Sequence, residues 1–362
     1  MNPTDAMRWI LCLCQPFLRL SHAKTLSVLS VSGLTLERAS LAELGRRVAR
    51  SHSSTAKSGI KRVDRFIGNG RIEPSEAMRP LVAWLTGPHK KLLVSLDWVD
   101  LRSYHCLVLA ARIRGRALPL VWAVYRTEEL YRSQNYLEYG LLHVFRTMVP
   151  KTTPVTLLAD RGFGRAEMAR TCQQLGFSYI LRIDPKAYID HRDFTGKLSA
   201  LPIQRGQERI LRNVAYRKDA RVCCHIAVLW LPEEEAPWFL MTNLSRIQAR
   251  KIARIYGHRM TIEEYFRDVK SKRNGFALRL SLIQNPRRLE RWLLILAWIY
   301  WLLVAVGLEA SKHYSPKLWS ANSRGRDCSF FTIGRFMVDQ LPIRLKRLMT
   351  HLRKDVLSQK WG

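Results

Sequence analysis

The chain has 362 residues and a formal net charge of +31, from 60 lysines and arginines against 29 acidic residues. So large an excess of positive charge indicates a polyanionic partner, most often a nucleic acid. Because 47% of the residues are hydrophobic, the chain can bury one large core or two smaller ones, which excludes a disordered basic tail.

The cysteines and the N-terminal residues both indicate a cytoplasmic protein. The seven cysteines are scattered without a Cys-x-x-Cys pair, so we expect reduced, mostly buried thiols. The apolar run from Trp9 to Cys14 is too short for a secretory signal, follows Asp5 and meets Pro16.

Residues 1–85 predict a helical, helix-turn-helix-like DNA-binding domain. The segments 41–48 and 59–67 have helical apolar spacing and are separated by a polar break at 51–55. Two short helices around a polar turn are typical of DNA readers, and an ordinary bundle with a solvated basic face is the alternative. The candidate DNA contacts on the second helix are Lys61, Arg62 and Arg65.

Residues 86–312 predict an α/β fold built on a mixed sheet, after a boundary at Pro80–Lys91. Three hairpin-like strands followed by alternating helices and strands favour this arrangement. Strands are expected at 92–99, 105–113, 118–125, 156–160 and 178–183, and helices at 135–148 and 165–175. Residues 185–245 predict a β-rich insertion, and residues 313–362 a basic helical region.

The stretch from Tyr256 to Lys270 predicts one helix with a polar stripe. At about 100° per residue, Arg259, Glu263, Arg267 and Lys270 fall within roughly 80° of arc from Tyr256. A neighbouring apolar stripe, expected to face the core, contains Ile255, Ile262, Phe266 and Val269. One carboxylate among several cations at the edge of a buried face suits a metal ion held against a phosphate backbone.

The segment Trp292–Leu308 is apolar throughout and about as long as the shortest membrane spans. A helix that is hydrophobic on all sides also occurs at the centre of a large core. The segment is single and follows closely on a charged helix, which favours the core helix over a basic membrane protein.

Two aspartates stand at informative places in the expected strands. Asp97 interrupts an apolar strand, and Asp160 follows the apolar run 155–159. Each alone is more often an edge or turn residue. Together with Glu263 they form a candidate triad, whose mutual repulsion requires cations between the carboxylates. Two divalent ions about 3.5–4 Å apart would meet that need and catalyse cleavage at phosphorus, and oxygen ligands favour Mg²⁺ or Mn²⁺.

The pattern Tyr-x2-Arg-x3-Glu-x6-Lys occurs as Tyr256, Arg259, Glu263 and Lys270. It matches the YREK signature of bacterial DDE transposases of the insertion-sequence-four family, and the chain resembles its cut-and-paste members from about residue 20 to 310. Further blocks similar to that family's lie at 60–65, 96–98, 160–163 and 238–243.

The resemblance implies an RNase-H-like catalytic core with the β-rich insertion between its fifth strand and the helix of Glu263. Asp97, Asp160 and Glu263 would be the catalytic triad that binds two Mg²⁺ or Mn²⁺ ions. Water would cut one strand at the element's end, and the freed 3′-hydroxyl would attack the opposite strand to form a hairpin. After the hairpin is reopened, the 3′-hydroxyl would attack target DNA.

The resemblance also implies contacts to DNA around the cut. Trp238 matches the family's tryptophan that receives a flipped base, although a core tryptophan on a strand is an equal alternative. Some relatives have an aromatic residue where this chain has Met260, so a two-sided aromatic clamp is not expected. The candidate phosphate contacts are Tyr256, Arg259, Lys270, Arg161 and Arg267.

The implied partners are the element's terminal repeats and target DNA, bound by a homodimer in the bacterial cytoplasm, associated with the nucleoid and not with a membrane. Two other functions stay open. One is an RNase-H-like nuclease without strand transfer, which would have no need of the YREK residues. The other is a DNA-binding repressor that has lost catalysis, against which the intact triad argues.

Overall fold

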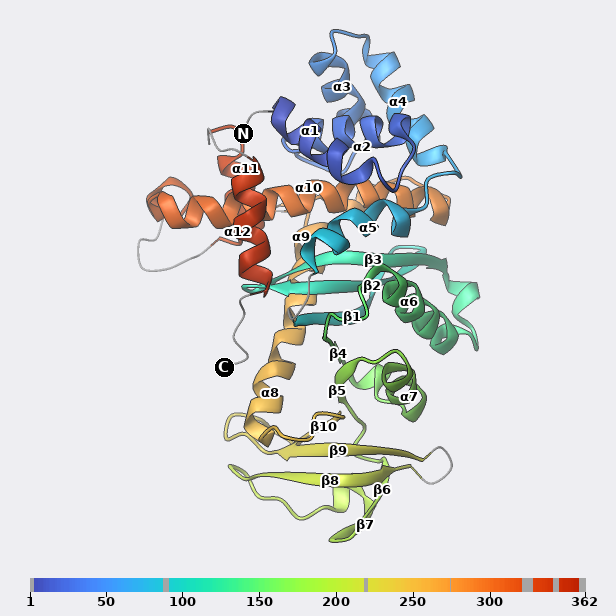
Figure 1. Cartoon of the computed structure of the whole chain (residues 1–362), viewed down its shortest axis with the longest axis vertical. Coiled ribbons are helices and arrows are strands. Elements are labelled where there is room, and N and C mark those ends of the chain that lie inside the picture. Colours follow the sequence, from blue (N-terminus) through green and yellow to red (C-terminus); the bar gives the residue numbers. More distant parts are fainter. Residues whose placement is uncertain are drawn as a thin grey trace.

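The computed structural model describes residues 3–86, 91–217, 221–273, 275–320, 328–340 and 345–357. A helical N-terminal region precedes a mixed ten-stranded sheet with flanking helices. Figure 1 shows the N-terminal helices at one end of the molecule, α10 (Pro286–His313) beneath them, and the sheet extending to the other end.

The N-terminal region is helical, as predicted. Its helices are α1 (Pro3–Cys14), α2 (Leu20–Ser32), α3 (Leu41–Ser51), α4 (Ala56–Gly68) and α5 (Pro74–Leu85). The hydroxyls of Ser40 and Thr55 cap α3 and α4 by accepting backbone N–H groups. The two helices cross in close contact at Gly45 and Gly59, since a Cβ on Gly59 would lie 2.0 Å from the Gly45 carbonyl oxygen.

The predicted boundary at Pro80–Lys91 begins too early. Pro80 lies inside α5, which continues to Leu85 before β1 begins at Leu92. Pro80 is buried with the apolar face of the helix, and this packing outweighs the missing hydrogen bond. Residues 87–90 of the predicted boundary lie outside the described residues.

The sheet has the strand order β3-β2-β1-β4-β5-β10-β9-β8-β6-β7. Strands β1, β4 and β5 are parallel, and β2, β3 and β10 pair antiparallel with their neighbours. The strands are β1 (Leu92–Leu101), β2 (Tyr104–Ile113), β3 (Arg116–Arg126), β4 (Val155–Ala159), β5 (Ser178–Arg182), β6 (Tyr188–His191), β7 (Phe194–Lys197), β8 (Glu208–Tyr216), β9 (Val222–Leu229) and β10 (Trp238–Thr242). This mixed α/β arrangement is consistent with an RNase-H-like core.

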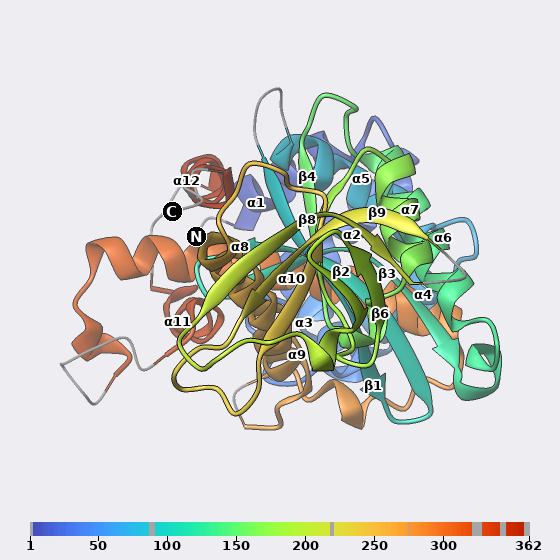
Figure 2. The same cartoon turned by 90° about the horizontal axis from the view of Figure 1, so that it is seen from below.

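The β-rich segment expected at 185–245 contains β6 to β10. Because β10 pairs with β5, with Leu240 opposite Arg182, the segment continues the central sheet. The pairing covers an edge that would otherwise expose unpaired backbone groups. Figures 1 and 2 show β6, β8 and β9 at the end of the molecule remote from the N-terminal helices.

Helix α10 is the centre of the main core. It carries the fully buried Trp292, Trp298 and Trp301, and the Trp301 indole N–H donates to the Pro119 carbonyl on β3 at 3.0 Å. In the described part of the chain it is the one helix long and apolar enough to cross a membrane, and its most apolar stretch is entirely buried in the protein. The helix therefore has the contacts expected of a core helix.

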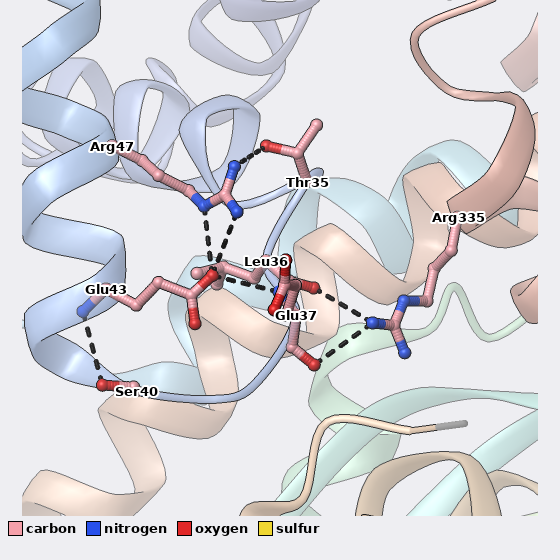
Figure 3. A network of polar contacts seen from close by, with 7 residues as sticks. All are labelled: Thr35, Leu36, Glu37, Ser40, Glu43, Arg47 and Arg335. Atoms are coloured by element: carbon pink, nitrogen blue, oxygen red, sulfur yellow. Dashed lines mark hydrogen bonds and ion pairs between the residues drawn. The ribbon is translucent and has the colours of Figure 1, made fainter. Parts of the chain in front are cut away.

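The remaining helices cover the sheet and join the two ends of the chain. They are α6 (Gln134–Met148), α7 (Ala166–Gln174), α8 (Ala249–Gly257), α9 (Thr261–Lys270), α11 (Phe330–Met337) and α12 (Leu345–Leu357). Arg335 on α11 donates to the carbonyls of Leu36 and Glu37, in the segment between α2 and α3. Figure 3 shows this contact beside the Glu43–Arg47 ion pair, which fixes the same segment from α3.

Candidate active site

The register of two parallel strands places two aspartates next to each other. β1 pairs with β4 so that Leu96 lies opposite Ala159. Asp97 and Asp160 are the next residues along each strand, so they follow the last paired residues at the same level of the sheet. Asp160 also caps the 3₁₀ turn Arg161–Phe163, where its Oδ1 accepts the Gly162 N–H at 2.9 Å. The turn fixes the Asp160 carboxylate at the end of β4.

The single helix predicted from Tyr256 to Lys270 is wrong. Helix α8 ends at Gly257, a 3₁₀ turn spans His258–Met260, and α9 begins at Thr261. The Thr261 hydroxyl donates to the His258 carbonyl at 2.8 Å and so supports the tighter turn. Burial, aided by Arg112, lowers the pKa of His258 to about 4, so this ring is neutral inside the turn. The apolar stripe is nevertheless buried as predicted, at Ile255, Ile262, Phe266 and Val269.

Arg259 connects two of the three candidate carboxylates. One guanidinium nitrogen lies 3.4 Å from Asp97 Oδ2, and another lies 2.6 Å from Glu263 Oε1. The Arg259 and Asp97 side chains are 12% and 16% exposed, whereas Glu263 is 42% exposed. The cluster is therefore open to solvent on the side of Glu263, where a ligand can reach it.

The cluster carries more negative charge than one guanidinium neutralises. Burial raises the pKa of Asp97 to about 7, and Asp160 adds to the rise. Arg259 and the Trp98 N–H oppose it, and Glu263 raises it further. Burial and the two neighbouring carboxylates thus outweigh the one guanidinium at Asp97, so the site favours the binding of added positive charge.

The donor set fits divalent cations in kind, because three carboxylates supply the hard oxygen ligands that Mg²⁺ and Mn²⁺ prefer. Within the described ranges, however, no three Asp, Glu, His or Cys side chains are grouped closely enough to hold a metal ion. The physical reason is visible at Arg259, whose guanidinium takes the position between Asp97 and Glu263.

Lys270, Tyr256 and Trp238 lie around this cluster. Asp100 and Asp97 act on the charge of Lys270, whose pKa is lowered mainly by burial. Tyr256 is buried and meets the Trp238 ring edge-on, with 5.7 Å between the ring centroids. The Trp238 indole is partly exposed, so a contact with DNA at this aromatic pair stays a prediction.

The other predicted DNA contacts lie on exposed elements. Arg161 is exposed in the turn after Asp160, and Arg267 is paired with Glu264 at 3.0 Å on α9. On α4, Lys61 and Arg65 are exposed and Arg62 is partly exposed. Figure 1 shows α4 among the N-terminal helices, beyond α10 from the strands that carry the aspartates.

Several charged residues next to the site were not predicted from the sequence. Arg182, at the end of β5, stacks over the Trp238 ring at 5.2 Å. Arg116 on β3 pairs with Glu264 and Asp268 on α9. A detectable signal existed for Glu138, which precedes Leu141 and Leu142 by three and four residues and so falls on the apolar face of its helix.

Comparison with known proteins supplies the family. The sequence model described as transposase DDE domain matches residues 101–302, which is more than half of the chain. The matched range contains Asp160 and Glu263 and begins four residues after Asp97. No curated protein matches the chain. Members of this family typically use divalent metal ions and act on DNA. The chain belongs to the transposase DDE domain family and is a DNA-cleaving transposase.

Proposed function

We propose that this chain is the transposase of a bacterial insertion sequence of the insertion-sequence-four family, with Tyr256, Arg259, Glu263 and Lys270 as its YREK residues. The spacing supports this assignment, and so does the contact between Arg259 and Glu263 across the 3₁₀ turn. In this proposal residues 1–85 bind DNA, and residues 86–312 form the catalytic domain with its insertion at 185–245. The helical C-terminal region is proposed at 313–362, of which residues 321–327, 341–344 and 358–362 lie outside the described residues.

Asp97, Asp160 and Glu263 are proposed as the ligands of two Mg²⁺ or Mn²⁺ ions. When bound, such ions would activate water and stabilise the alkoxide that leaves phosphorus. The single observation that carries this proposal is the convergence of Asp97 and Glu263 on one guanidinium, beside the strand end that holds Asp160. Arg259 stands 162 residues after Asp97 in the sequence, and the fold makes its guanidinium a cation shared by the Asp97 and Glu263 carboxylates.

Arg259 is proposed to change partners during the reaction. Without DNA, its guanidinium neutralises Asp97 and Glu263. A phosphate oxygen pair is the other strong partner of a guanidinium, so DNA would draw Arg259 away and free the carboxylates for metal ions. Lys270 and the exposed Arg161 would hold further phosphates. Trp238 would stack on an unpaired base, supported by Tyr256 and Arg182.

The remaining steps follow from the proposed family. The chain would bind terminal inverted repeats, cut each end through a hairpin and join the 3′-hydroxyl ends to target DNA. Two ends must be held together for this, so we propose a homodimer on DNA. Its place in the bacterial cell would be the cytoplasm, on the nucleoid.

The test is cleavage of labelled duplex DNA carrying the element's terminal repeats, followed on a denaturing gel with Mg²⁺. We expect a hairpin product, and we expect Glu263→Gln to lower its rate by about 10³-fold or more, equivalent to several kcal/mol of transition-state stabilisation. The matched control is Glu264→Gln, which changes the adjacent carboxylate that faces Arg116.

Each other product pattern selects a different function. Nicking without a hairpin would support the plain nuclease, and binding without cleavage would support the repressor. Equal losses in the Glu263 and Glu264 variants would show that the loss of charge on α9, and not the loss of one ligand, matters.

A further inference from the structure

A buried carboxylate lies beside the proposed triad and is not part of it. Glu138 on α6 is 1% exposed, on the helix face that carries Leu141 and Leu142. A charged group in such a place costs several kcal/mol unless it is paired and hydrogen-bonded. Burial raises the pKa of Glu138, and Arg165 opposes that rise. A carboxylate held at this cost is expected to have specific partners.

Its two oxygens have different partners. Oε1 accepts the indole N–H of Trp98 at 2.9 Å and an amide N–H of Gln134 at 3.4 Å. Oε2 accepts a guanidinium N–H of Arg165. The Arg165 side chain also packs over the Tyr139 ring, 6.0 Å from its centroid. One carboxylate therefore joins three segments of the chain, which are β1, α6 and the residue before α7.

The partners of Glu138 are covalently close to the two aspartates. Trp98 directly follows Asp97 on β1, and successive strand residues point to opposite faces of the sheet. Arg165 lies two residues after the Arg161–Phe163 turn that Asp160 caps, and its guanidinium donates to the Gly162 carbonyl inside that turn. Glu138 thus holds the backbone beside each aspartate from the face opposite to Arg259.

The contacts of Glu138 with Trp98 and Arg165 lie where the pairing of β1 with β4 ends. The pairing of β1 with β4 ends at Leu96 and Ala159, one residue before each aspartate. No paired residues of β1 and β4 follow that point, so the ladder does not extend past the two aspartates. The bridge from Trp98 through Glu138 to Arg165 begins where the ladder stops.

We infer that Glu138 is a positioning residue for DNA cleavage, which fixes the separation of Asp97 and Asp160 through Trp98 and Arg165. The inference rests on the proposed role of the two aspartates as metal ligands. Because the Glu138 side chain is buried, it does not contact DNA. Supports of this kind typically contribute about 10- to 100-fold to metal affinity or activity.

The test compares Glu138→Gln with Glu167→Gln, an exposed carboxylate on α7 that also pairs with an arginine, Arg170. Mn²⁺ is titrated into the full chain without DNA, where Arg259 competes for the carboxylates in the wild type and in the variants alike, and binding is followed by electron paramagnetic resonance. We expect Glu138→Gln to bind Mn²⁺ about tenfold more weakly and to lower kcat for cleavage by a similar factor. The DNA concentration at half-maximal rate should stay the same, and Glu167→Gln should match the wild type.

A second, milder variant distinguishes a loss of positioning from a loss of folded protein. Trp98→Phe removes one hydrogen bond and leaves the Glu138–Arg165 pair intact, so it should fold and shift the Mn²⁺ midpoint in the same direction by a smaller factor. The double variant Glu138→Gln/Arg165→Gln removes both charges together. If it regains thermal stability but keeps the weak Mn²⁺ binding, the bridge acts on position and not on stability alone.

The outcomes separate the two proposals. A wild type that neither binds Mn²⁺ nor cleaves DNA would overturn the proposed function, and the role of Glu138 with it. A wild type that does both, with Glu138→Gln and Trp98→Phe unchanged in Mn²⁺ affinity, would overturn only the role of Glu138. A loss of activity that merely follows the loss of folded protein would do the same.

Discussion

Helix α9 carries two clusters of arginine and carboxylate that differ in how completely they are closed. On one side, Arg259 connects Glu263 to Asp97, and Glu263 is 42% exposed. On the other side, Arg116 reaches both Asp268 at 2.8 Å and Glu264 at 3.1 Å. The second cluster is deeper, since the Asp268 side chain is only 8% exposed.

The difference lies in the neutral groups around the charges. Asp268 also accepts the hydroxyl of Tyr300 at 3.0 Å, from the buried helix α10. This cluster ties α9 to β3 and α10, so it is suited to hold the helix in place. The cluster at Glu263 is open and has an excess of negative charge, so its cation can be exchanged. The two clusters show how one helix combines a fixed side with a reactive side.

The largest effect on stability is expected from Arg116→Gln, which leaves the buried Asp268 carboxylate without its guanidinium. Breaking a buried pair from one side typically costs about 3–5 kcal/mol. We expect the free energy of unfolding to fall by about 3 kcal/mol at pH 8, measured by urea denaturation. Arg267→Gln, which removes the exposed partner of Glu264, is the matched control.

The same variant has a pH dependence of known sign. Burial raises the pKa of folded Asp268 from its ordinary value of 3.8 to about 6. A raised acid pKa stabilises the fold fully below the unfolded value, and this contribution is lost as pH rises through about 6. Arg116 lowers that pKa, so without it the loss should extend to higher pH. The destabilisation should therefore be smaller at pH 5 than at pH 8, and an equal cost at both would contradict a buried charged Asp268.

At the open cluster, removal of the arginine is expected to strengthen metal binding, and this effect is smaller than the loss of stability in Arg116→Gln. Arg259→Gln removes the cation that competes with metal ions for Asp97 and Glu263. We expect Mn²⁺ to bind the DNA-free chain about tenfold more tightly, equivalent to about 1.4 kcal/mol, while DNA cleavage falls. Isothermal titration calorimetry measures the first effect. Arg254→Gln, an exposed residue of α8 with the same charge change, is the control. Weaker Mn²⁺ binding would mean that Arg259 orients the carboxylates instead of competing for them.

The sequence allowed the site to be predicted where the signal is local. Asp97 interrupts an apolar strand and Asp160 follows an apolar run, so both are visible in the sequence, and Glu263 follows from the motif spacing. The break between α8 and α9 was not visible, because Gly257 is the one glycine in the run 256–270, whose helical spacing is continuous and which has no proline. The fold class followed from the order of strands and helices, which is also a local pattern.

The contacts between distant segments could not be predicted from the sequence. Glu138 meets Trp98 across 40 residues and Arg165 across 27, and the pairings depend on how α6 packs on the sheet. The position of β10 beside β5 likewise depends on which sheet edge is free. The sequence alone indicates that Glu138 lies on an apolar helix face, but it does not identify the hydrogen-bond donors, Trp98 and Arg165, that contact it.

The smallest effect is expected from Glu264→Gln, which tests whether the fixed side of α9 depends on Asp268 or on the whole cluster. Glu264 is 28% exposed, and Arg267, one of its partners, is 71% exposed. Ion pairs at such positions contribute about 0–1 kcal/mol, so we expect a loss below about 1 kcal/mol and a cleavage rate close to that of the wild type. A loss as large as that of Arg116→Gln would make Glu264 the principal partner of Arg116. In that case the Arg116–Glu264 pair, and not the buried Arg116–Asp268 pair, would fix α9, and with it Glu263, beside the sheet.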